Sequence, residues 1–143
     1  MAITSAICTS FKVEILKGVH NFTASSGDTF NIALYTSSAS LGAATTAYTT
    51  SNEVSGSGYT AKGNALTSVT PVADSTTAVC DFSDTSFTSA SFTARGCMIF
   101  NDSASGDPAV CIIDFGSDKT VTSGTFTIQF PAADASNAIV RIA

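Results

Sequence analysis

SFTARGCMIF-NDSASGDP-AVCIIDFG-SDKTVTSG-TFTIQF, residues 91–130, is the stretch that decides the fold of this chain. It contains three apolar runs, and the two breaks between them, 101–108 and 117–124, are rich in turn-forming residues. In the last run Phe126, Ile128 and Phe130 alternate with polar residues, and this period of two places one face of a strand against a core. We therefore predict three strands, of which the first two form a hairpin whose tip spans 101–108.

The segment upstream of this stretch contains the one helical pattern in the chain. Phe11, Ile15 and Val19 recur every four residues, which predicts an amphipathic helix over 10–19. Gly18 suits the end of that helix, because glycine adopts the left-handed conformation that terminates helices.

The remaining segments predict a single β-rich domain over residues 1–143. Residues 36–63 form a long polar connection that shows no pattern of a regular sheet, so we expect it to be mobile or to reach a partner. Consecutive strands fill 64–143, and about seven or eight strands in all favour an antiparallel β-sandwich or jelly-roll-like fold with one short N-terminal helix. Besides the three runs above, the predicted strands are 30–35, 66–72 (with Pro71 at an edge), 77–82, 85–88 and 139–142.

Composition narrows the classes of function. Of the 143 residues, 44% are apolar and only 12% charged, with a net charge of -5, which argues against binding to nucleic acid or to anionic membranes. A weakly charged surface is easily desolvated, so this balance favours assembly with other proteins. No stretch has the length and apolarity of a membrane span or of a signal peptide, and we expect synthesis in a cytosol-like compartment.

The four cysteines show no metal-binding spacing. Cys80, Cys97 and Cys111 lie inside predicted strands, and Cys8 lies near the N-terminus. Small apolar residues suit such positions, so we expect buried reduced thiols, with a disulfide as the alternative.

Charged residues near the strand ends offer two further candidates. Asp102, Asp107, Asp114 and Asp118 flank the two breaks; we interpret them as turn aspartates, with a calcium site as the alternative. Arg95 lies among apolar neighbours on a strand, and a half-buried charge needs a partner. We expect Arg95 to pair with Asp81 or with Asp114, or otherwise to face a partner subunit.

The residues indicate no reaction. The glycine-rich segment 52–63 ends in Lys62-Gly63, whereas a phosphate-binding loop needs Ser or Thr after its lysine and a helix to follow. Nothing in the chain has the spacing of a nucleophile elbow, and no pair of carboxylates is marked for acid–base chemistry. We therefore predict no enzyme, no catalytic residues, no bound cofactor and no metal.

Four segments of the chain resemble small virion structural proteins of tailed bacteriophages. These segments are FKVEILKGVHNF (11–22), the run from DTFNIALY to GNALT (28–67), FTARGCMIFND (92–102) and the run from IIDFGSDK to AIVRI (112–142). The resemblance is greatest to capsid decoration, or cement, proteins. It implies a β-rich subunit made in the host bacterial cytoplasm that binds the major capsid protein of an assembled shell, stabilises it and forms a homo-oligomer (dimer or trimer).

An alternative function is a tail or head appendage that recognises a host surface glycan. Glycan sites generally use exposed aromatic side chains, which offer an apolar face and a polar edge. The chain has no tryptophan, so Tyr35, Tyr48 and Tyr59 are the candidates for such a site. This places glycan recognition second to capsid binding.

Overall fold

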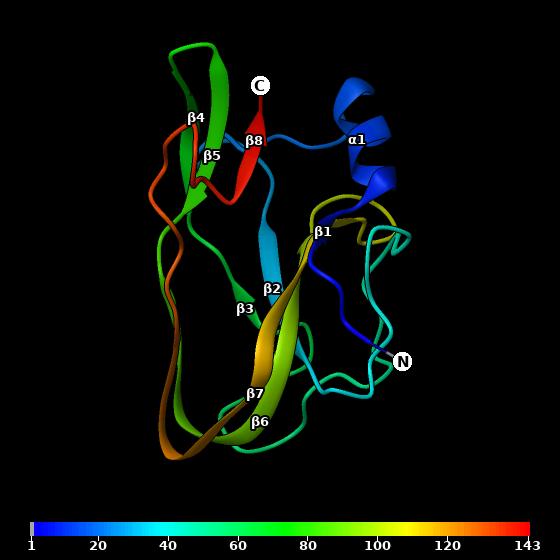
Figure 1. Cartoon of the computed structure of the whole chain (residues 1–143), viewed down its shortest axis with the longest axis vertical. Helices are drawn as coiled ribbons and strands as arrows, with labels where there is room; N and C mark the ends of the chain where they lie inside the picture. The colour runs from blue at the N-terminus through cyan, green and yellow to red at the C-terminus, as the bar shows by residue number, and fades with distance from the viewer. Residues whose placement is uncertain (1) are drawn as a thin grey trace.

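The computed structural model describes residues 2–143 and shows a mainly β protein with one short helix (Figure 1). Its elements are β1 (Ala6–Ile7), α1 (Thr9–Leu16), β2 (Phe30–Tyr35), β3 (Asn64–Ala65), β4 (Ser68–Asp74), β5 (Thr77–Phe82), β6 (Thr85–Asn101), β7 (Ala109–Ile128) and β8 (Val140–Ile142). The strands form two antiparallel sheets, one in the order β1-β7-β6-β2-β3 and one in the order β4-β5-β8. This confirms the predicted fold class, and a sandwich-like arrangement fits the two sheets.

The hairpin of β6 and β7 is the longest feature of the fold. Its strands pair from Thr85 opposite Ile128 to Phe100 opposite Ala109, so the predicted hairpin and its tip at 101–108 are confirmed. The predicted break at 117–124 is wrong, because these residues continue β7. Likewise, the short piece predicted at 85–88 is the beginning of β6 rather than a separate strand.

The hairpin bends back on itself, and this bend accounts for the turn-forming residues inside β7. Both ribbons curve sharply at the bottom of Figure 1, where the pairing register shifts on either side of Ala90. Phe87 and Phe92 would lie about 16 Å apart on a straight strand, but their ring centroids are 6.0 Å apart. Ser89 and Ser123 adopt positive φ near the bend, which small polar residues tolerate better than bulky ones.

The centre of the large sheet is covered on both faces. All six residues of β2 are buried, including the polar Asn31. On one face Phe100 stacks on Tyr48 of the long connection, with ring centroids 4.8 Å apart. On the other face Phe30 stacks on Phe22, with centroids 4.3 Å apart. Double coverage therefore explains why this strand has no exposed side.

The alternation predicted for the end of β7 holds, but burial there is partial. Phe126, Ile128 and Phe130 are each half-buried and pack against the core, while Thr127 and Gln129 between them are exposed. Phe130 lies beyond the last residue of β7.

Helix α1 is shorter than predicted and lies at the same end of the molecule as the small sheet (Figure 1). It begins after Cys8 and ends at Leu16, so the predicted extension to Val19 is wrong. Gly18 has a φ of 72° and turns the chain away two residues after the helix. No helix in residues 2–143 is long and apolar enough to cross a membrane.

The connection 36–63 is held against the body, contrary to the expectation that it is untied. Val54 is buried, and its N–H donates to the carbonyl of Leu34 in β2 at 2.9 Å. Gly58 and Gly63 have positive φ, and a Cβ on either would collide with the main chain of β6 or β2. The glycines of this segment therefore serve close main-chain packing.

Candidate functional site

The carboxylates of the hairpin tip are ion-paired. Asp102 and Asp107 contact Lys62 Nζ at 2.7 and 2.9 Å, and these hydrogen bonds raise the pKa of Lys62 above its ordinary value. Within residues 2–143 no group of three or more His, Cys, Asp or Glu side chains is placed to hold a metal ion. The two aspartates thus neutralise a lysine that joins the long connection to the tip.

Arg95 has one of its two predicted partners. Its Nε donates to Asp114 Oδ1 at 3.0 Å, and its Nη1 lies 3.9 Å from Asp118. Asp81, the other candidate, does not contact Arg95 within ion-pair distance. The N–H of Gly116 and then Arg95 hold the pKa of Asp114 below its ordinary value. The four aspartates considered for calcium therefore divide into two pairs, each on one basic side chain.

The four cysteines are buried free thiols, as predicted. Burial raises the pKa of Cys80 and of Cys97 to about 12 and that of Cys8 to about 11, and the pKa of Cys111 is also well above its ordinary value. Near neutral pH these thiols stay protonated. They pack as small apolar side chains and are not activated nucleophiles.

The three tyrosines considered for a glycan site are engaged inside the protein. Tyr35 is fully buried and donates to the carbonyl of Thr49 at 2.7 Å. Tyr48 and Tyr59 donate to the two oxygens of Glu53 at 2.6 Å each, and burial with this contact raises the pKa of Tyr48 to about 12. These rings hold the long connection in place, and they are not free to stack on a sugar.

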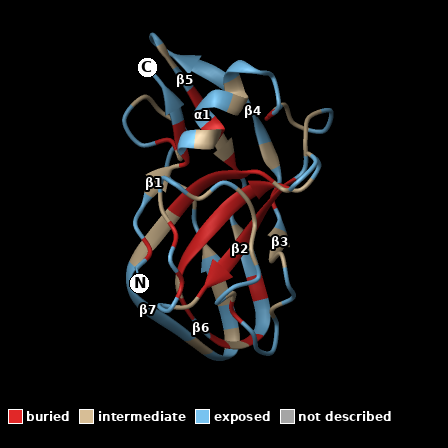
Figure 2. Ribbon diagram, turned by 90° about the vertical axis from the view of Figure 1, so that its right-hand side faces the viewer, coloured by how far each residue is buried: buried red, intermediate tan, exposed pale blue. Residues whose placement is uncertain are grey.

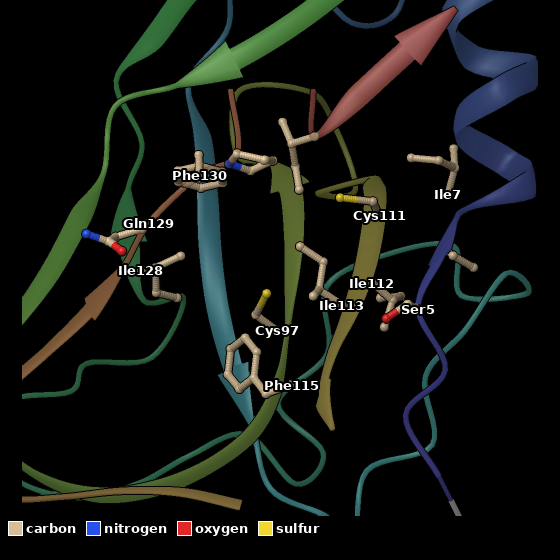
Figure 3. A pocket seen from close by; sticks show the side chains of 13 residues that line it. Ser5, Ile7, Cys97, Cys111, Ile112, Ile113, Phe115, Ile128, Gln129 and Phe130 are labelled. Atoms are coloured by element: carbon tan, nitrogen blue, oxygen red, sulfur yellow. The ribbon is translucent and has the colours of Figure 1, made fainter. Parts of the chain in front are cut away.

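An apolar groove of about 560 Å³ opens beside β7. Ile113 and Phe115 line it from β7, and Ile128 and Phe130 line it from the far side of the bend (Figure 3). Cys97 also lines the groove, and its lining contains no charged residue. The groove therefore offers neither an acid nor a base for a reaction.

The exposed large apolar side chains belong to α1, residues 17–19, β4 and β8, which together with β5 form one end of the molecule (Figure 1). We call this the apical end. Figure 2 shows it as mostly exposed, in contrast to the buried strands of the large sheet. Leu16 is 89% exposed, and every large apolar side chain exposed within residues 2–143 belongs to this end: Val13, Leu16, Val19, Val69, Val72 and Ile142.

A small cleft of about 130 Å³ separates α1 from the three-stranded sheet. Phe11 and Ile15 line it from the helix, and Ala78 and Ile142 line it from the sheet. Phe22, which stacks on Phe30, also lines the cleft and is itself buried. The apical end thus combines an exposed apolar surface with a preformed apolar cleft.

The sequence contained a signal for this surface that the helical pattern hid. Val13 and Leu16 lie off the stripe of Phe11 and Ile15, so α1 is apolar on more than one side. The sequence held no comparable signal for the exposure of β4, because this exposure depends on the position of the small sheet in the fold.

Comparison with protein-family models, with curated proteins and with solved structures found no match.

Proposed function

We propose that this protein is a structural protein of a tailed-phage virion that binds the assembled capsid and stabilises it, as decoration or cement proteins do. The observation that carries the proposal is that the exposed large apolar side chains of residues 2–143 all belong to the elements of the apical end. Exposed apolar patches are typical of sites that bind another protein. The resemblance of segments 11–22, 28–67, 92–102 and 112–142 to phage virion proteins supports a capsid as that protein.

The physical mechanism that we propose is bridging. A subunit, or a homo-oligomer of two or three subunits, that contacts two neighbouring capsomers must lose both contacts before the capsomers separate. Each contact can be weak while the joint effect is strong. The long connection does not supply the contact in this proposal, because Tyr48, Tyr59 and Glu53 hold it to the body.

The glycan-binding alternative receives less support from the described residues. Its tyrosine candidates are turned inward, and the large exposed side chains of the apical end are aliphatic. Aliphatic side chains suit a protein partner better than a sugar, because they cannot stack on a sugar ring.

The test is to add purified protein to phage heads that lack it. Occupancy by quantitative mass spectrometry and the melting temperature of the heads should both rise with the wild-type protein. Leu16→Asp should reduce occupancy, whereas the control Thr122→Asp, which places the same charge at an exposed site near the bend, should not. If heads bind no wild-type protein, capsid binding is refuted; binding to host-surface glycans instead would establish the appendage function.

A further inference from the structure

We infer that the cleft between α1 and the three-stranded sheet binds one large apolar side chain of a partner protein. This side chain is Phe or Leu, and acidic residues lie on both sides of it in the partner. This inference rests on the proposed function, because it gives the chemistry that the partner surface presents to the apical end. It adds a defined site and a defined charge to that surface.

The size and lining of the cleft suit a single side chain. A volume of about 130 Å³ is close to that of an engineered apolar cavity of about 150 Å³ that stays dry and binds benzene. The side chains that line the cleft are apolar, apart from the thiol of Cys80, which stays protonated. Phe22 is held by stacking on Phe30, so part of the lining is preformed. Side chains that fill such pockets are the usual anchors of protein interfaces.

The helix beside the cleft has more apolar side chains than this protein buries. Phe11 is its one buried residue, although Val13, Ile15 and Leu16 are also large and apolar. A helix that is apolar on several sides is normally buried on several sides. An occupant of the cleft would also cover Ile142, which lines it and is 55% exposed.

Charge decides which protein surface fits. Lys12 and Lys17, on α1 and at its end, have no carboxylate within ion-pair distance among residues 2–143, whereas Lys62 and Arg95 each contact two. Glu14, the one acidic residue of α1, is turned to His20, with Oε1 3.1 Å from Nε2. The helix that lines the cleft and its C-cap residue thus carry two lysines and one glutamate, although the chain carries a net charge of -5. An acidic partner complements the two lysines.

Two other occupants fit less well. An added strand would need a free edge of the small sheet, which is β4 or β8. On β4, Pro71 has no N–H and the pairing register shifts between Val69 and Val72, and β8 offers only the three residues Val140–Ile142. A second copy that placed its own α1 against this helix would bring Lys12 and Lys17 of both copies together, and like charges oppose that contact.

The experiment is an NMR titration of the ¹⁵N-labelled full-length protein with a synthetic peptide, acetyl-Asp-Asp-Phe-Asp-Asp-amide. We expect saturable amide shifts at Ile15, Ala78 and Ile142, with a dissociation constant on the order of 1 mM, as expected for one buried ring with weak ionic help. A peptide with Ala in place of Phe should produce no saturable shifts. A peptide with Lys in place of Asp should bind at least about tenfold more weakly, since the helix is cationic.

Matched variants locate the binding. Ala78→Phe fills the cleft from an exposed strand position, and it should abolish the shifts while leaving the thermal melt cooperative. The double variant Lys12→Glu and Lys17→Glu should weaken binding several-fold. Lys119→Glu, the same change at a lysine on β7, should not.

The outcomes separate this inference from the proposed function. Absence of saturable shifts, shifts confined to the groove beside β7, or undiminished binding by Ala78→Phe would overturn the cleft as the site. Concentration-dependent broadening without peptide that Leu16→Asp removes would show that a second copy occupies the surface, and would also overturn the inference. If phage heads bind wild type and Ala78→Phe equally, capsid binding stands and the cleft is refuted. If the peptide binds the cleft but heads do not bind the protein, the cleft stands and the capsid proposal fails.

Discussion

The centre of the large sheet and the apical end both contain strands with large apolar side chains, but only the centre is covered by the rest of the chain on both faces. In the centre, the long connection covers one face and Phe22 lies on the other, so β2 has no exposed residue. At the apical end, α1 meets the small sheet across an open cleft, and β4 is exposed almost throughout. An apolar strand thus becomes core only where the rest of the chain supplies two coverings.

The two regions also differ in how they treat charge. Near the centre, Lys62 and Arg95 each contact two aspartates. At the apical end, Lys12 and Lys17 lack such partners among the described residues. Both differences agree with the proposal that the apical end binds a partner, because exposed apolar side chains together with unpaired lysines suit an acidic protein surface.

The largest effect should come from placing a charge in the closed region. Ile99→Asp, near the end of β6 and paired with both β2 and β7, should leave the protein unfolded at 25 °C, because Ile99 is fully buried and an unpaired buried charge costs about 4 kcal/mol or more. Circular dichroism and a thermal melt measure the result.

The matched change in the open region is Leu16→Asp. This variant should stay folded and melt within about 3 °C of wild type, since the side chain is 89% exposed. A cooperative native-like melt for Ile99→Asp, or loss of folding in Leu16→Asp, would contradict the division into a closed and an open region.

Alkaline pH should destabilise both regions through their thiols. Burial raises the pKa of Cys97 in the large sheet and of Cys80 in the small sheet from 9.0 to about 12. The unfolded chain therefore loses these protons first, so stability is full below pH 9 and falls as the pH rises from 9 towards 12. Urea unfolding midpoints between pH 7 and 11 should show this fall.

Alanine variants test the thiols separately. Cys97→Ala and Cys80→Ala should each be less stable at pH 7 but show a shallower fall above pH 9. An unchanged slope in both variants would mean that tyrosines, whose pKa values are also raised, control the alkaline transition.

How far the sequence predicts these regions depends on the range of the interactions involved. The strands 30–35 and 77–82 match β2 and β5 to the residue, because local turn-forming residues bound them. The break at 117–124 was misplaced because the same residue types allow a bend inside a paired strand, and only pairing with β6 distinguishes the two.

The candidate site was less accessible to sequence reasoning. The pairing of Arg95 with Asp114 could be predicted, since the two residues lie on neighbouring strands near the open end of a predicted hairpin, where Asp114 is opposite Gly96. The contacts of Glu53 with Tyr48 and Tyr59 could not, because they depend on the path of a connection without periodicity. The cleft joins residues from both ends of the chain, Phe11 and Ile142, and no local pattern relates them.

An intermediate loss of stability is expected from a change at Glu53, which holds the long connection over one face of the large sheet. Glu53→Gln should destabilise the protein by about 1–3 kcal/mol, because the carboxylate accepts hydrogen bonds from both tyrosines and from the N–H of Lys62. Hydrogen exchange should accelerate in 36–63 more than in β6. Tyr48→Phe, which removes one of the three bonds, should have a smaller effect. Equal acceleration throughout the chain would show that the connection and the core open as one unit.

The smallest effect should come from the ion pair on the sheet surface. Arg95→Gln should lower the melting temperature at pH 7 by no more than about 3 °C, because Arg95 and Asp114 are both partly exposed and such pairs contribute little. The folded pKa of Asp114 is lowered, so its contribution is present above the ordinary carboxyl pKa of 3.8 and is lost as the pH falls through the lowered value. The difference between wild type and Arg95→Gln should therefore narrow in acid. Gly116 also donates to Asp114, and that bond persists in the variant, so the narrowing should be incomplete. A loss much larger than this at pH 7 would mean that Arg95 supports the bend, and that the closed region depends on surface charge as well as on its two coverings.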